Sequence, residues 1–150
     1  RFGSVASMEI RRIEAGILDS GTDFDLTTNP WEAGLGAFVD LNANDFIGRG
    51  ALMKASRGRR LFGLTCADVP GYRQPILEDG KVVGHVTAGA RSPFLGCGIG
   101  YGRMLEANDW TGRELSIRNA DGTLLPCTVT DLPFYDPEKR IPRGIDRMIP

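Results

Sequence analysis

Six short apolar segments between residues 61 and 129 constrain the fold of this 150-residue chain more than any other feature. Glycine, proline, aspartate and asparagine separate the segments, as turn residues separate the strands of a barrel or sandwich. Two connections are the dipeptides Asp79-Gly80 and Asp121-Gly122, which favour hairpin turns with positive φ at both central residues. We therefore predict antiparallel strands at residues 61–65, 75–78, 81–87, 98–104, 114–118 and 124–129.

Charge divides the chain into two parts near residue 47. Residues 1–47 carry three basic and eight acidic side chains, a net of −5, whereas residues 48–150 carry fifteen basic and eleven acidic ones, a net of +4. This shift predicts two structural units, of which the second is the better host for an anionic ligand. The total charge of −1 argues against a general nucleic-acid binder, and the lack of a long apolar run predicts a soluble protein without a membrane span.

The first unit places a carboxylate in an unusual position. We predict a helix over residues 4–15, which Ser4 caps and Gly16 ends. Glu14 falls among the isoleucines on its apolar side, Ile10, Ile13 and Ile17. A partly buried carboxylate costs free energy unless hydrogen-bond donors reach it. From the residues alone, donors within the chain are a sufficient explanation, and they would be backbone amides, Arg11 or Arg12.

The aspartates and arginines between residues 19 and 60 can be explained by a structural role as well as by a functional one. Residues 19–29 are predicted to be an ordered loop, in which Asp23 and Asp25 form an acidic pair or accept bonds from the loop itself. Asp45 is a candidate cap for a short helix over residues 48–56. The basic cluster is either a solvated face or a contact for ligand carboxylates, and it consists of Arg57, Arg59 and Arg60.

Cysteine, histidine and glycine patterns indicate no catalytic motif. The three cysteines, without any CxxC pair, predict reduced, buried thiols rather than a zinc site or a disulfide framework. His85 lies in a predicted strand far from any nucleophile motif, so we expect a hydrogen-bonded structural histidine. The glycines of residues 96–100 lack the pattern of a phosphate-binding loop and predict close strand packing or bulges.

The two ends of the sequence also allow predictions. The chain begins at Arg1 rather than at methionine and shows no signal-peptide pattern, so we expect a processed product or a piece of a longer chain. The residues from Asp136 onward contain Pro137, Pro142 and Pro150 and are expected to form an extended strap on the surface.

Four blocks of sequence add a further signal. They are RRIEAGILDSGTDFDLTTNPWEAGLGAFVDL, DFIGRGAL, DGKVVGHVTAGARSPFLG and LPFYDP. In this order they resemble the C-terminal half of the tetrahydrofolate-dependent aminomethyltransferase family, which includes the glycine cleavage system T-protein and the folate domains of dimethylglycine and sarcosine dehydrogenases. The blocks span nearly the whole chain, so the match is specific although each block alone is weak.

The resemblance implies an α+β architecture. Residues 1–47 would be the end of a mixed α/β folate-binding domain, and residues 48–150 a C-terminal antiparallel β-barrel. It also implies tetrahydrofolate as the cofactor and Glu14, in a motif similar to the family's LEAG, as the residue that binds the pterin ring. A carboxylate suits this role because it accepts two parallel hydrogen bonds. Trp31 and Tyr135 are further candidates for the wall of the folate site.

Several positions depart from the family pattern. Ala43 falls about where T-proteins carry a folate-contacting arginine, and only Phe134 and Tyr135 match the aromatic residue near the C-terminus. The tripeptide Asn29-Pro30-Trp31 is more similar to the demethylase branches. The aspartate that relatives place near the reacting folate nitrogen has no counterpart, so we assign no catalytic residue and no metal ligand.

The function implied is that of the C-terminal portion of an aminomethyltransferase-like one-carbon transferase in the cytoplasm. A small molecule would donate the one-carbon unit, and the missing N-terminal half would come from the same or another chain. This fragment alone should not turn over. The alternatives are a folate-dependent demethylase acting on dimethylsulfoniopropionate or aryl methyl ethers, a non-catalytic folate-binding module, and a purely structural domain.

Overall fold

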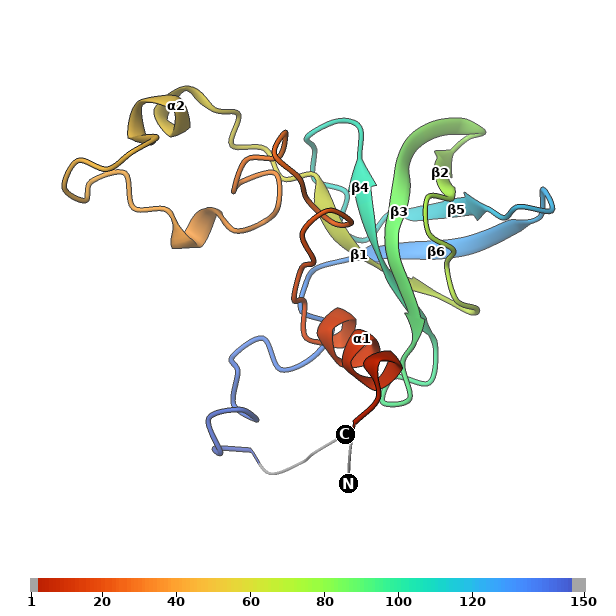
Figure 1. The fold of residues 1–150 in the computed structure, drawn as a ribbon. Helices are drawn as coiled ribbons and strands as arrows, with labels where there is room; N and C mark the ends of the chain where they lie inside the picture. The colour runs from red at the N-terminus through yellow and green to blue at the C-terminus, as the bar shows by residue number, and fades with distance from the viewer. Residues whose placement is uncertain (1–2, 147–150) are drawn as a thin grey trace.

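The computed structural model describes residues 3–146, and most of its regular structure is a closed barrel of six antiparallel strands (Figure 1). The strands follow the order β1-β4-β3-β2-β5-β6, and β6 pairs with β1 to close the barrel. All six segments predicted from the sequence are strands, so the barrel prediction is confirmed. Their bounds are β1 Leu61–Cys66, β2 Pro75–Glu78, β3 Lys81–Arg91, β4 Gly98–Met104, β5 Glu114–Arg118 and β6 Leu124–Thr130.

The two predicted hairpin turns differ in the structure. Asp79 and Gly80 both have positive φ, 49° and 79°, as predicted for the turn between β2 and β3. Between β5 and β6, Gly122 has a φ of 86° but Asp121 does not adopt positive φ, so the turn type predicted there is wrong. The Asp121 carboxylate instead accepts hydrogen bonds from the backbone N–H and hydroxyl of Thr123, at 2.9 and 2.6 Å. These side-chain bonds hold a different turn.

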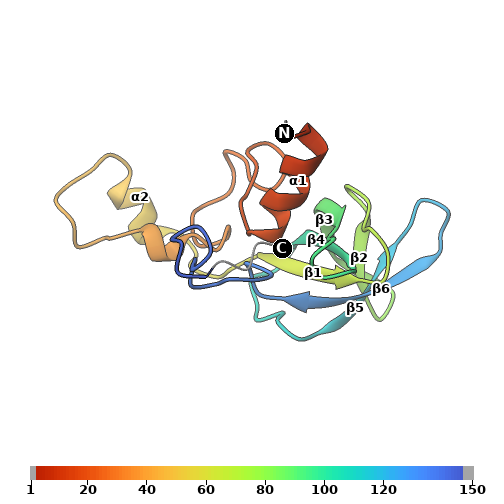
Figure 2. The ribbon, with the colours of Figure 1, turned by 90° about the horizontal axis from the view of Figure 1, so that it is seen from below.

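The barrel has apolar contacts on both sides of its wall. Its interior is filled by residues such as Phe62, Leu64, Ile76, Ile117 and Val129. A second cluster joins the outer face of β1, β3 and β4 to the helix α1 (Val5–Glu14), which lies against β3 and β4 in Figures 1 and 2. Because both faces are covered, nearly every residue of β1 and β4 is buried, rather than every second one.

Helix α1 begins and ends close to the predicted residues. The Ser4 side chain accepts a hydrogen bond from the Ser7 N–H at 3.1 Å, which confirms the predicted cap. Gly16 follows the helix with a φ of 71°. Ile17 was expected on the buried side of the helix, but it lies beyond this turn and is 58% exposed. Within residues 3–146, no helix has the length and hydropathy that a membrane span requires.

The glycines of β3 and β4 allow a connecting loop to pack directly on the strands. A Cβ atom at Gly89 would overlap the carbonyl oxygen of Pro70, and one at Gly98 would overlap the carbonyl oxygen of Asp68. Gly100 is similarly enclosed by Ala88 and the Pro70 ring. The prediction of close packing at this glycine-rich segment is therefore confirmed.

Residues 35–58 form an arm that projects away from the barrel (Figure 2). The arm contains a 3-10 helix, η1 (Gly36–Phe38), and a short helix, α2 (Arg49–Lys54). At its base, the Asn29 amide donates to the carbonyl oxygen of Ser56 at 3.1 Å. The predicted Asp45 cap is wrong, because Gly48 with a φ of 91° precedes α2 and no side chain caps it.

The C-terminal strap, residues 131–146, crosses the end of α1. Its Phe134 N–H donates to the backbone oxygen of Glu14 at 3.2 Å, and Lys139 Nζ donates to that of Ala15 at 3.0 Å. The strap follows the surface as expected, but it is a series of turns rather than an extended segment. Arg1 and the terminal Pro150 lie outside the described residues. The predicted unit boundary between residues 47 and 48 stays a prediction.

Candidate functional site

Glu14 is the last residue of α1, and only 3% of it is exposed. This position is unfavourable for a carboxylate in two ways. The C-terminal end of a helix carries partial negative charge, and burial removes the water that would solvate the group. Among the described residues, the Ser92 side chain compensates, since its Oγ donates to Glu14 Oε1 at 2.5 Å. Ser92 Oγ also accepts a bond from the Leu95 N–H at 2.9 Å, which leaves its hydroxyl proton for Glu14.

No arginine neutralises Glu14 within residues 3–146. Arg12 is engaged elsewhere, with Glu9 at 2.6 Å and Asp23 at 2.7 Å, and Arg11 forms no ion pair or hydrogen bond in this range. The expectation that Arg11, Arg12 or backbone amides pair with Glu14 is therefore wrong. Since Ser92 is the one described donor to the Glu14 side chain, the carboxylate keeps acceptor capacity for a ligand.

A cavity of about 290 Å³ lies beside this carboxylate. We call it the Glu14 cavity. It is formed between α1 and the loop that follows β3, and it is lined by Ser4, Ala6, Ser7, Ile10, Arg11, Glu14, Pro93 and Phe94. Its volume is close to the lower end of the roughly 300–1,000 Å³ range of small-molecule sites. It has the size for one flat heterocycle rather than for a large ligand.

A second cavity of about 620 Å³ lies between α1 and the C-terminal strap, and Tyr135 is part of its wall. Arg11 lines both cavities. The rings of Phe94 and Tyr135 meet edge to face, with centroids 4.9 Å apart. Phe94 belongs to the Glu14 cavity and Tyr135 to the second one, so this aromatic contact joins the two.

The charge of Glu14 influences the ionisation of Tyr135. Burial raises the pKa of Tyr135, and the negative charges of Glu14 and Asp136 add to the shift, while Arg11 opposes it. The structure thus brings together two of the three residues predicted for the folate site, Glu14 and Tyr135.

Trp31, the third, lies apart from both cavities. Its ring packs under the Arg57 guanidinium at 5.5 Å, and its edge contacts Gly36, where a Cβ atom would overlap it. Trp31 therefore stabilises the base of the arm in this structure. Its role in a ligand site stays a prediction.

Asp23 and Asp25 do not form an acidic pair. Asp23 is buried and accepts hydrogen bonds from Arg12, from the Asp19 N–H and from Thr87, at 2.7, 2.8 and 2.7 Å. A register shift in β3 makes Thr87 a bulge residue, which directs its side chain towards Asp23. Asp25 is exposed, and hydrogen bonds from Thr27 are the main cause of its lowered pKa. Both aspartates thus have structural explanations.

The basic cluster meets groups of the chain itself. Arg59 pairs with Asp131 at 2.6 Å, and Arg60 lies 3.6 Å from Glu32. With Arg57 over Trp31, all three arginines have partners, which favours the structural interpretation of this cluster.

His85 lies in β3 as predicted but lines a separate polar cavity of about 380 Å³ with Arg73 and Arg103. Burial, followed by the charges of these two arginines, lowers its pKa. We find no hydrogen bond to its ring within the described residues, so the expected bond is not observed. Within the same residues, no group of three histidine, cysteine or acidic side chains is arranged to hold a metal ion.

Sequence reasoning missed two residues of the site, Ser92 and Phe94. Both stand in the segment Ser92-Pro93-Phe94, inside one of the blocks that carry the family resemblance. They lie near Glu14 only because β3 ends beside the end of α1. Ser92 and Glu14 are 78 residues apart in the chain. No local sequence pattern encodes such a contact.

The fold and the site together define a β-barrel module with an outer helix that presents a buried carboxylate to a small cavity. The glycine cleavage T-protein C-terminal barrel domain matches residues 59–136, and the chain belongs to this family. The resemblance to the C-terminal half of the aminomethyltransferases is therefore confirmed, and the chain is a C-terminal module of the aminomethyltransferase type.

Three relatives illustrate the match. The chain is 37% identical to a trimethylamine-oxide aldolase of Ruegeria pomeroyi over 92% of its own length and 18% of the relative's. It is 39% identical to an aminomethyltransferase of Clostridium botulinum, covering 71% of the chain and 30% of the relative. It is also 36% identical to an aminomethyltransferase of Thermosynechococcus vestitus, a match that covers 83% of the chain and 35% of the relative. The chain thus spans about a third or less of the length of these curated relatives.

A solved structure shows the same fold. The crystal structure of glycine cleavage system aminomethyltransferase T from Bartonella henselae superimposes with a TM-score of 0.75, over 86% of this chain and 38% of that one. The sequence identity of 23% supports the fold alone.

Proposed function

We propose that this chain is the C-terminal portion of a tetrahydrofolate-dependent one-carbon transferase and that Glu14 orients the pterin ring. One observation carries the proposal: a buried carboxylate, held by Ser92 through one oxygen, keeps acceptor capacity next to a cavity of about 290 Å³. Such a group is costly in a folded protein unless a donor meets it.

The residues present fit this cofactor. The edge of a pterin offers a ring N–H beside an amino group, and a carboxylate is the acceptor that pairs with two adjacent donors. The Phe94 ring, on the wall of the same cavity, offers an apolar surface for a flat heterocycle. Tetrahydrofolate, when bound, supplies the nitrogen atoms that accept the one-carbon unit.

The protein's own contribution is position. Ser92 fixes the direction of the Glu14 carboxylate, and the strap holds the end of α1 through the Phe134 N–H. Because α1 packs on β3 and β4, the barrel fixes the orientation of Glu14 relative to the loop that carries Phe94. Orientation of this kind lowers the barrier of a transfer reaction without a charged catalytic group.

Replacement of Glu14 by glutamine tests the proposal. Glutamine keeps an oxygen for Ser92 but loses the charge, so we expect folate affinity to fall at least about tenfold, or ~1.4 kcal/mol. Titration calorimetry with 5-formyltetrahydrofolate, on this chain and on the full gene product, measures the change. Glu9→Gln is the matched control, because it removes an exposed carboxylate from the same helix. Equal affinity in the wild type and the Glu14→Gln protein would refute the assigned role.

The one-carbon donor is proposed to be a small molecule with its carbon on nitrogen. The Ruegeria pomeroyi relative is named for trimethylamine oxide, and the other two relatives for aminomethyl transfer. A screen of the full gene product with aminomethyl, methylamine, methylsulfonium and aryl methyl ether donors separates this proposal from the demethylase alternative. Transfer from only the sulfonium or ether donors would favour the demethylase.

We propose that the N-terminal half of the folate site lies in the same or another chain and that the protein acts in the cytoplasm. The proposal of a separate N-terminal half is supported by the fact that the chain covers only about a third or less of the length of its relatives. Folate binding without transfer by any donor would indicate a non-catalytic module, and no folate binding at all would indicate a structural one.

A further inference from the structure

Two cysteines occupy paired positions across the seam that closes the barrel. Cys66, the last residue of β1, is the direct partner of Cys127 in β6. Directly opposed residues of antiparallel strands have Cα atoms roughly 4.5–5.5 Å apart, which lies within the roughly 4.4–6.8 Å range of disulfides. Opposed side chains also point to the same side of a sheet, and both thiols belong to the interior cluster. Both cysteines are free thiols in this structure.

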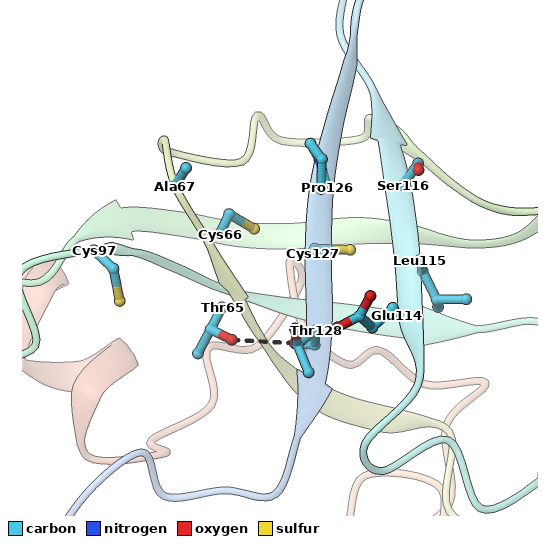
Figure 3. Close-up of a pocket in the computed structure, with 10 residues that line it drawn as sticks. All are labelled: Thr65, Cys66, Ala67, Cys97, Glu114, Leu115, Ser116, Pro126, Cys127 and Thr128. Carbon is cyan, nitrogen blue, oxygen red and sulfur yellow. Dashed lines mark hydrogen bonds between the residues drawn. The ribbon is translucent and has the colours of Figure 1, made fainter.

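A cavity of about 640 Å³ lies beside this pair. It lies along β1, β5 and β6, and all three cysteines contribute to its lining (Figure 3). In this view Cys66 and Cys127 are on adjacent strands, whereas Cys97 lies to one side. The exposed fractions of the pair are small but not zero, 6% for Cys66 and 4% for Cys127. Because so little of either residue is exposed, a protein oxidant cannot reach the pair, and the oxidant has to be a small molecule.

The two thiols differ in acidity. Interaction with the Cys127 thiol, followed by burial, raises the pKa of Cys66, and interaction with the Cys66 thiol lowers the pKa of Cys127. The opposite directions of the two shifts favour Cys127 as the attacking thiol. Since the thiolate is the nucleophile in cysteine chemistry, Cys127 would react before Cys66.

We propose that Cys66 and Cys127 form a reversible cross-strand disulfide when a small hydroperoxide enters this cavity. The Cys127 thiolate attacks an oxygen of the hydroperoxide, and the O–O bond breaks to give a sulfenic acid and an alkoxide or hydroxide, which takes up a proton. The Cys66 sulfur then attacks the sulfenic sulfur, and water leaves with the Cys66 proton. The two thiols are oxidised by two electrons, and the hydroperoxide is reduced to an alcohol or water.

The first test uses the unaltered chain. After treatment with hydrogen peroxide, intact mass should show the loss of two hydrogen atoms, and a non-reducing peptide map should join the peptides of Cys66 and Cys127. Dithiothreitol should restore the original mass. The oxidised protein should melt at least about 5 °C higher, because the bond closes a long loop in the unfolded chain. A disulfide that includes Cys97, or free thiols at both positions after peroxide, would overturn the proposal.

Serine variants test the order of the steps. Cys97→Ser should form the bond as the wild type does, whereas Cys66→Ser and Cys127→Ser should not. In Cys66→Ser, dimedone should trap a sulfenic acid on Cys127, because the resolving thiol is missing. In Cys127→Ser, dimedone labelling of Cys66 should be at least tenfold lower. Equal labelling of the two variants would overturn the assigned order. If a variant fails to fold, the peptide map of the wild type still tests whether the disulfide forms.

Discussion

At the scale of single residues, Glu14 and Asp23 show two ways in which this chain accommodates a buried carboxylate. Asp23 receives three donors, from Arg12, Asp19 and Thr87, and its acceptor capacity is largely used. Glu14 receives one described donor and lies beside a cavity. The difference explains why the two acidic side chains have different assignments, one structural and one functional. Burial alone does not separate them, since Asp23 is 1% and Glu14 3% exposed.

The ionisation of Tyr135 provides a reporter of the Glu14 charge. Because the negative charge of Glu14 helps to raise the pKa of Tyr135, Glu14→Gln should lower this pKa towards its ordinary value near 10. The phenol of the wild type should therefore stay protonated to a higher pH than that of the variant. NMR titration of a tyrosine labelled at Cζ measures both values. As a control, Glu9→Gln should leave the Tyr135 pKa unchanged. An unchanged Tyr135 pKa in Glu14→Gln would contradict the proximity of the Glu14 carboxylate to the Tyr135 phenol.

At the scale of elements, glycine positions show where strands and loops are in direct contact. Gly89 of β3 faces the carbonyl oxygen of Pro70 so closely that Gly89→Ala should destabilise the barrel by about 2–4 kcal/mol. Gly50 in α2 has open space around it, so Gly50→Ala should stabilise by about 0.5 kcal/mol through helix propensity. Urea denaturation of the two variants provides the comparison. Similar effects of the two substitutions would contradict the packing of the residue 70 loop on β3.

The elements themselves were largely predictable from the sequence, and their ends were less so. All six strands follow from local apolar runs and turn residues, which act over a few residues. The turn at Asp121 and the cap at Asp45 were predicted wrongly, because a side-chain hydrogen bond in one case and a left-handed Gly48 in the other decided the local conformation. Of the candidate site, the burial of Glu14 could be predicted from the helical pattern, whereas its site role came from the family resemblance. Ser92 depends on a contact between distant segments.

At the scale of the whole molecule, Asp23 holds the first segment to the barrel. It joins α1 through Arg12, the loop through the Asp19 N–H, and β3 through Thr87. Asp23→Asn should therefore cost about 2–4 kcal/mol, because the uncharged amide leaves Arg12 and a buried donor poorly paired. Chemical denaturation measures this loss. Asp25→Asn, two residues away on the exposed side of the loop, should change stability much less.

If Asp23→Asn and Asp25→Asn had equal effects, the Asp23 contacts would not be what joins the two parts. The sequence could not distinguish these aspartates, since both flank Phe24 in a polar loop. Only the path of β3, with its bulge at Thr87, makes one of them an internal link.

Because β1 and β6 pair to close the barrel, the first and last strands of this unit are neighbours. The chain enters the barrel just before Leu61 and leaves it just after Thr130, and the Arg59–Asp131 ion pair of 2.6 Å ties the entrance to the exit. A closed unit whose two connections emerge side by side can be exchanged as a cassette without altering the spacing of the segments that flank it. Chimaeras that exchange the barrel between relatives would thus be the natural way to ask which properties the barrel carries and which belong to the segments around it.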